Sequence, residues 1–172
     1  MSSPIRYAIA SLSLLTCFNL HAEYRQLAWA DLIPEGAQTV IPQPIALHDL
    51  DDLAQVLSED GPAATQLDPA APVVDALDGV TVRLPGYMTP LHIDEEGRIA
   101  EFLFVPYYGA CIHVPPPPSN QIVHVRSELG AREADIYQPF WIEGTLRVEP
   151  SSSSLASAGY QMQANKIYPY YP

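Results

Sequence analysis

Apolar and polar residues alternate in several short segments of the second half of the chain. In residues 80–84 (VTVRL), three aliphatic side chains alternate with a threonine and an arginine, which is the pattern of a half-buried strand. Pro85 and Gly86 follow, and a glycine inside such a pattern predicts a bend or a bulge. Residues 99–105 are apolar on both faces at their end, which indicates a central strand. Further strands are predicted at 121–125, 140–148 and 159–168.

A short helix is predicted between the third and the fourth of these strands. Residues 127–136 (SELGAREADI) begin with Ser127, and serine often caps the N-terminus of a helix. Three strands, a helix and two strands are the element order of the OB-fold, a small five-stranded barrel. We therefore expect a mainly β, OB-fold-like barrel over residues 73–172, with an open antiparallel sandwich as the alternative.

Residues 23–72 are predicted to form a partly helical, acidic arm in front of the barrel. Around Trp29, apolar residues end at a Pro-Glu-Gly sequence, which predicts a short helical turn. Packing of this tryptophan on the barrel is favoured over ligand binding. Leucines at helical spacing in residues 50–57 predict a short amphipathic helix. Residues 61–72 are rich in Pro and Ala without periodicity, which is typical of a linker.

Residues 1–22 have the pattern of an export signal. Arg6 is followed by an apolar run at 7–20 and by a small residue at the expected cleavage position. The run is shorter than the roughly 20 residues that span a bilayer, so cleavage is favoured over an N-terminal membrane anchor. Residues 14–17 (LLTC) resemble a lipoprotein signal, so lipid attachment to Cys17 is the alternative. No later segment is long and apolar enough to span a membrane, and we expect a periplasmic protein.

The charge of the chain excludes one common use of the OB-fold. The formal net charge is −12, and residues 23–78 contain eleven acidic residues and a single arginine. There is no basic patch that could hold a phosphate backbone, so nucleic-acid binding is not expected. An acidic arm of this kind more often favours solubility than a specific partner.

One segment, FLFVPYYGACIHVPPPPSNQIVHV at residues 102–125, contains the residues with metal-binding chemistry. Cys111 and His113 are two positions apart, so in an extended segment their side chains point to the same side. A thiolate and an imidazole so placed could bind zinc or copper, with His92 and His124 as further candidate ligands. The four prolines that follow would hold the segment as a stiff polyproline II rod.

Packing explains the same residues without a metal, and it is the favoured interpretation. A single cysteine is often buried as a small hydrophobe, and Cys111 has no disulfide partner once Cys17 leaves with the signal. A nucleophile made of Cys111 and His113 is a third alternative, although the chain has neither a Cys-x-x-Cys nor a Gly-x-Ser-x-Gly motif. Glu143, a single carboxylate on the polar face of its strand, is expected to be solvated.

Four stretches of the chain resemble a known bacterial family. They are WADLIP, LDGVTVRLPGYMTPL, EFLFVPYYGACIHVPPPPSNQIV and FWIEGTL, and the resemblance extends from about residue 29 to residue 168. The family is DUF3299, whose members are exported proteins of Gram-negative bacteria with no assigned activity. The resemblance implies an association with export-type ABC transporters and with periplasmic metal-related proteins. It carries over no catalytic residue.

Together these patterns favour a non-enzymatic periplasmic binding or accessory protein, with residues 1–22 as signal, 23–72 as arm and linker, and 73–172 as barrel. The expected partner is a periplasmic or inner-membrane transport component, and a link to metal handling through zinc or copper is part of the same hypothesis. The alternative is a periplasmic thiol- or metal-dependent enzyme that uses Cys111 and His113.

Overall fold

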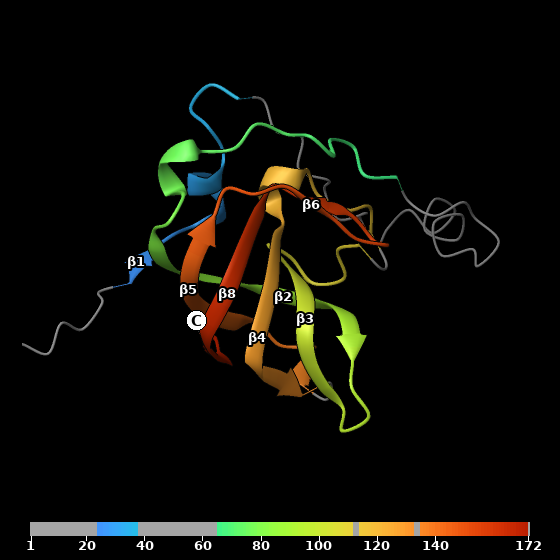
Figure 1. Ribbon diagram of the computed structural model, residues 1–172. Helices are drawn as coiled ribbons and strands as arrows, with labels where there is room; N and C mark the ends of the chain where they lie inside the picture. Colours follow the sequence, from blue (N-terminus) through green and yellow to red (C-terminus); the bar gives the residue numbers. More distant parts are fainter. Residues whose placement is uncertain (1–23, 38–64, 112–113, 133–134, 172) are drawn as a thin grey trace, which may run out of the picture.

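The computed structural model describes residues 24–37, 65–111, 114–132 and 135–171 (Figure 1). The predicted export signal, the predicted helix at 50–57 and His113 lie outside these ranges. No helix within the described ranges is long and apolar enough to cross a membrane.

Five strands form a closed barrel, and this confirms the predicted mainly β, OB-fold-like architecture. Around the barrel the order is β2, β3, β4, β8 and β5, and β5 pairs again with β2. The β4–β8 pairing is parallel and the others are antiparallel. The barrel strands are β2 (Thr81–Ile93), β3 (Arg98–Val105), β4 (Val123–Arg132), β5 (Phe140–Arg147) and β8 (Tyr160–Pro169).

Short elements are added to this barrel at its edges. Strand β1 (Arg25–Gln26) pairs in parallel with β2, and β6 (Ser151–Ser152) pairs with β7 (Ser157–Ala158) as a hairpin between β5 and β8. Three short 3₁₀ turns, η1 (Trp29–Leu32), η2 (Asp75–Leu77) and η3 (Ser119–Gln121), complete the described structure. The turn at Trp29–Leu32 is the helical turn predicted from the sequence.

The helix predicted over residues 127–136 is wrong for its first six residues, because β4 continues through them. Ala131 and Arg132 pair with Ile99 and Arg98 of β3. Ser127 is buried and Glu128 is exposed, so the burial here follows the two-residue period of a strand. Pairing with β3 thus outweighs the helical propensity of this segment.

A glycine lets strand β2 change partners halfway along the barrel. Residues 81–86 pair with β5, and residues 87–93 pair with β3. A Cβ atom at Gly86 would lie 2.6 Å from the carbonyl oxygen of Val105 and 2.9 Å from the indole of Trp29. The bend predicted at Pro85–Gly86 is therefore a place where only glycine fits.

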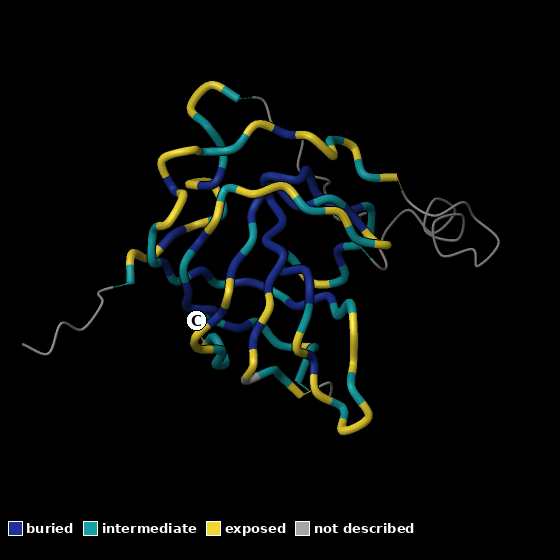
Figure 2. Tube along the Cα trace, in the orientation of Figure 1, coloured by how far each residue is buried: buried dark blue, intermediate teal, exposed yellow. Residues whose placement is uncertain are grey.

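Two apolar clusters lie on opposite sides of β3. The larger one fills the barrel and includes Phe102 and Phe104, and the buried strands run through the centre of Figure 2. Leu103 and Val105 alternate with these phenylalanines, so their side chains point to the outer face of the strand. There they form a second cluster, which we call the outer cluster. It consists of Leu103, Val105, Ala110, Ile122, Ala156 and Ala158.

The described parts of the acidic arm pack against one end of the barrel. The Trp29 indole donates a hydrogen bond to the Pro85 carbonyl at 2.7 Å, and its ring lies 5.9 Å from that of Phe104. The predicted packing role of this tryptophan is confirmed. The buried amides of Asn120 and Gln121 donate to the carbonyls of Pro72 at 2.8 Å and Trp29 at 2.9 Å. The SNQ sequence after the prolines therefore anchors the arm.

Candidate functional site

Cys111 lies in the turn after β3, at the edge of the outer cluster. It is partly buried, and its φ of 70° is unusual for a residue with a Cβ atom. Burial raises the pKa of its thiol to about 12, so the thiol is protonated at neutral pH. A protonated thiol is a poor nucleophile and a poor metal ligand. These properties agree with the packing interpretation.

The other candidate metal ligands are not gathered around Cys111 in the described part of the chain. His92 is exposed at the far end of β2. His124 lies on β4, where it is 6% exposed and is bound to Glu101 and Ser151. Within the described ranges, no group of three or more His, Cys, Asp and Glu side chains is arranged to hold a metal ion. The zinc or copper site, which includes His113, stays a prediction.

The outer surface of β3, β4, β8 and β5 carries a continuous set of polar side chains. Register places His124, Gln161 and Arg147 in one row across β4, β8 and β5, and Arg126 and Gln163 in the next row. Their neighbours along each strand point into the barrel, so these side chains point outward. We call this surface the polar face. It consists of Glu101, His124, Arg126, Arg147, Gln161 and Gln163.

A carboxylate organises one side of the polar face. Oε1 of Glu101 accepts hydrogen bonds from His124 Nε2 at 2.8 Å, and from Arg126 Nε at 3.1 Å and Nη2 at 2.9 Å. Burial raises the pKa of this carboxyl, but the hydrogen bonds from His124 and Arg126 outweigh it and hold the pKa below its ordinary value. Glu101 is therefore ionised at neutral pH, so the imidazole nitrogen that faces it, Nε2, is the hydrogen-bond donor.

The other imidazole nitrogen connects the barrel to the β6–β7 hairpin. His124 Nδ1 lies 3.0 Å from the Ser151 hydroxyl, and in the tautomer that carries its proton on Nε2 alone it accepts the hydrogen bond of this hydroxyl. Serine, histidine and carboxylate occur in this order in serine hydrolases. Here Arg126 also neutralises Glu101, and Ser151 lies in a two-residue strand rather than in a strand-to-helix turn. We interpret the chain of hydrogen bonds as a link that fixes the hairpin to the barrel.

A cavity of about 160 Å³ lies beside this network. Arg126 and Arg147 are 57% and 59% exposed, so their guanidinium groups are accessible to a ligand. The amides of Gln161 and Gln163 add neutral donors and acceptors. The lining residues are His124, Arg126, Arg147, Glu149, Gln161, Met162 and Gln163.

Sequence reasoning named His124 but missed the residues around it. Glu101 and Ser151 are 23 and 27 positions away from it along the chain, and only the strand register brings them together. The available signal was the alternation in each strand, which places Glu101, Arg126 and Gln163 on outward positions. Alternation shows which residues share a face, but it does not show which strands are neighbours.

Glu143 on β5 is buried, so the expectation that it is solvated is wrong. It is 6% exposed; its Oε1 accepts a hydrogen bond from the Tyr168 hydroxyl at 2.6 Å, and its Oε2 lies 3.0 Å from Lys166 Nζ. Burial raises the pKa of this carboxyl, but the contacts with Tyr168 and Lys166 and the charge of Arg83 outweigh it and lower the pKa overall. The aromatic C-terminal strand thus covers an ion pair.

This lowered pKa predicts a pH-dependent contribution to stability. The ionised Glu143 stabilises the fold at pH values above the ordinary value of 4.5, and the contribution disappears as the pH falls through the lower pKa of the folded state. We expect Glu143→Gln to lower the free energy of unfolding by about 1 kcal/mol at pH 7 and by less at pH 3. Urea denaturation at both pH values measures this difference. Tyr137→Phe, at a side chain that is 71% exposed, should change neither value. An equal loss at both pH values would contradict the prediction.

Comparison with known proteins identifies the relatives of this fold. The family model described as "Protein of unknown function (DUF3299)" matches residues 29–169. The crystal structure of a DUF3299 family protein from Pseudomonas aeruginosa PAO1 superposes with a TM-score of 0.75 and is 58% identical in sequence. The match covers 87% of this chain and 98% of that protein. No curated protein matches the chain. The chain therefore belongs to the DUF3299 family.

Proposed function

We propose that this protein is a non-enzymatic binding protein of the bacterial envelope and that the polar face is its contact surface. The observation that carries the proposal is the ordered Glu101–His124–Arg126 network beside an accessible polar cavity. OB-folds bind their ligands on the outer face of the second and third barrel strands, which here are β3 and β4. On one part of that face, Leu103 of β3 is already covered by the other members of the outer cluster. The polar face is the part that is open.

The chemistry of the cavity favours an acidic group on the partner. Two exposed guanidinium groups, of Arg126 and Arg147, flank the amides of Gln161 and Gln163. Guanidinium groups bind carboxylates with two parallel hydrogen bonds, which gives both affinity and orientation. Glu101 binds Arg126 through Nε and Nη2, and Asp78 lies 3.9 Å from Arg147 Nη1, so the partner would bind the remaining N–H groups of the two guanidinium groups. A carboxylate of a partner protein fits this arrangement.

The sequence supports the compartment and the kind of partner. The signal-like residues 1–22 support export to the periplasm. The family resemblance supports a periplasmic or inner-membrane transport component as the partner, and a link to metal handling through that component. The raised pKa of Cys111 makes direct metal binding by its thiol less favourable.

Photo-crosslinking in cells tests the proposal. A photoreactive residue at Gln161 or Gln163 should capture one defined envelope protein, whereas the same residue at Glu96, in the turn between β2 and β3, should not. The double variant Arg126→Ala/Arg147→Ala should reduce the yield at least about tenfold, because one lost charged hydrogen bond is worth about 1.5–3 kcal/mol. Equal yields from Glu96, or a yield unaffected by the double variant, would overturn the proposal.

A second measurement tests the non-enzymatic part directly. A fluorophosphonate probe, which labels activated serines, should not modify the purified protein. Labelling of the wild type that is lost in Ser151→Ala and in His124→Ala would show that the Ser151–His124–Glu101 chain is catalytic. That result would replace the binding proposal by an esterase or peptidase activity.

A further inference from the structure

Strands β4 and β8 separate halfway along the barrel. They pair in parallel over four residue pairs, from Val123–Tyr160 to Arg126–Gln163. Beyond these pairs, β4 pairs with β3 alone, and β8 pairs with β5 alone. Within the described residues, no strand pairs with the two edges that face each other here. We call the gap between 127–132 of β4 and 164–169 of β8 the β4–β8 seam.

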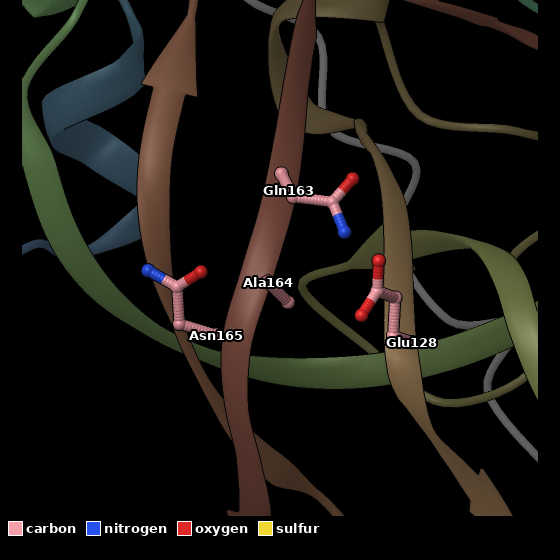
Figure 3. A pocket seen from close by; sticks show the side chains of 4 residues that line it. All are labelled: Glu128, Gln163, Ala164 and Asn165. Atoms are coloured by element: carbon pink, nitrogen blue, oxygen red, sulfur yellow. The ribbon is translucent and has the colours of Figure 1, made fainter.

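Two cavities lie along the β4–β8 seam. The first has a volume of about 310 Å³ and is lined by Glu128, Gln163, Ala164 and Asn165 (Figure 3). Figure 3 shows the Glu128 carboxylate on β4 opposite the Gln163 amide on β8. The second, of about 320 Å³, lies further along the same two strands. Its lining consists of Gly130, Ala131, Arg132, Asp135, Phe140, Ile167 and Pro169.

A backbone carbonyl of the seam points across the gap. The Ala164 carbonyl accepts a hydrogen bond from the Ser127 hydroxyl at 3.2 Å, where a paired strand would offer a backbone N–H. Backbone groups of a strand alternate between its two edges, so further groups of β8 beyond Ala164 face the same gap. An open strand edge of this kind is a template for another extended chain.

The charges and side chains of the seam differ between its two ends. Glu128 is exposed and makes no ion pair within the described residues, whereas Arg132 is paired with Asp135 at 3.4 Å. The uncompensated charge of the seam is therefore negative, on a protein whose net charge is −12. At the other end the half-buried Ile167 and Pro169 offer apolar surface. A basic side chain suits the first end, and an apolar side chain suits the second.

We propose that the β4–β8 seam binds an extended segment of a partner protein by β-strand addition. A Lys or Arg of this segment lies against Glu128, and an apolar residue further along it lies over Ile167 and Pro169. The inference rests on the proposed function, because it names the part of the protein partner that the binding protein recognises. Gln163 lines both the cavity of the polar face and the first cavity along the seam, so one partner can contact both.

The experiment places a photoreactive residue at Asn165, which is exposed in the seam, and maps the captured peptide by mass spectrometry. The expected product joins Asn165 to a segment that contains a Lys or Arg, in the same partner that Gln161 captures. Glu128→Lys should reduce the yield at least about tenfold, and changing the basic residue of the partner to Glu should restore it. Glu96→Lys is the matched control, since it makes the same charge change at an exposed carboxylate away from the seam, and it should keep the yield.

The outcomes separate the two proposals. Capture from Gln161 but not from Asn165 would overturn the seam inference and leave the polar face as the contact surface. Capture from neither position would overturn both. A captured second copy of this chain, or a yield unaffected by Glu128→Lys in a variant that unfolds at the same urea concentration as the wild type, would also overturn the inference.

Discussion

Replacing Gly144 by alanine is expected to destabilise the barrel by at least about 3 kcal/mol, which is the upper part of the range for overpacked sites. Gly144 lies on β5, at the irregularity in the pairing of this strand with β8. A Cβ atom here would overlap the backbone carbonyl oxygen of Gln163 and would lie 2.9 Å from Met162 Cγ. The Met162 side chain could turn away. The Gln163 carbonyl oxygen could not, because it is part of the backbone of β8, which pairs with β5 here.

Urea denaturation measures this effect. Unfolding of small proteins in urea has a slope of about 1–3 kcal/mol per molar, so a loss of 3 kcal/mol lowers the midpoint by about 1–3 M. It is also a large fraction of the about 5–15 kcal/mol that stabilises a typical domain. The variant should therefore accumulate poorly in cells as well.

Gly36→Ala is the matched control for this prediction. No atom lies within 4 Å of a Cβ built at Gly36, so space is available, and only its φ of 80° disfavours alanine. That backbone strain is worth about 1–2 kcal/mol. If Gly144→Ala is no more destabilising than Gly36→Ala, strands β5 and β8 do not approach each other as closely as the structure shows.

The barrel could be predicted from the sequence because its signals are local. Alternation marked the five strands, and the glycine in LPG marked the bend at Gly86, where a Cβ atom would meet the backbone of Val105. Trp29 was identified as a packing residue because a single large aromatic in a short apolar turn has few other uses. Each of these inferences depends on a few neighbouring residues.

Predictions that depend on distant neighbours failed or stayed incomplete. Residues 127–132 are a strand because β3 pairs with them, and their own sequence suggests a helix as readily. Glu143 is on the outer face as predicted, but Tyr168 and Lys166 of β8 bury it. The partners of His124 were invisible for the same reason, because the register between β3, β4 and the β6–β7 hairpin is a property of the whole fold.

Removing one oxygen atom from the core should weaken the attachment of the arm and of the segment that joins it to the barrel. Tyr160 is completely buried, and its hydroxyl accepts a hydrogen bond from the Val74 amide at 2.7 Å and donates one to the Leu32 carbonyl at 2.8 Å. Tyr160→Phe leaves both backbone groups unpaired in the interior. A buried group without its partner is destabilised by about 1–3 kcal/mol, so we expect a total loss of about 2–3 kcal/mol.

Whether the arm alone or the whole barrel loses stability distinguishes two ways in which the arm can be attached. If the arm unfolds together with the barrel, Tyr160→Phe lowers the urea midpoint, and amide hydrogen exchange accelerates equally at core residues such as Val82 and at Leu27 of the arm, whose amide donates to the Arg83 carbonyl. If the arm can open by itself, exchange accelerates at Leu27 and leaves Val82 unchanged. Because Asn120 and Gln121 of η3, the turn that leads into β4, also bind the arm, we expect the first result. A variant with unchanged stability would show that the Tyr160 hydroxyl does not connect the arm to the core.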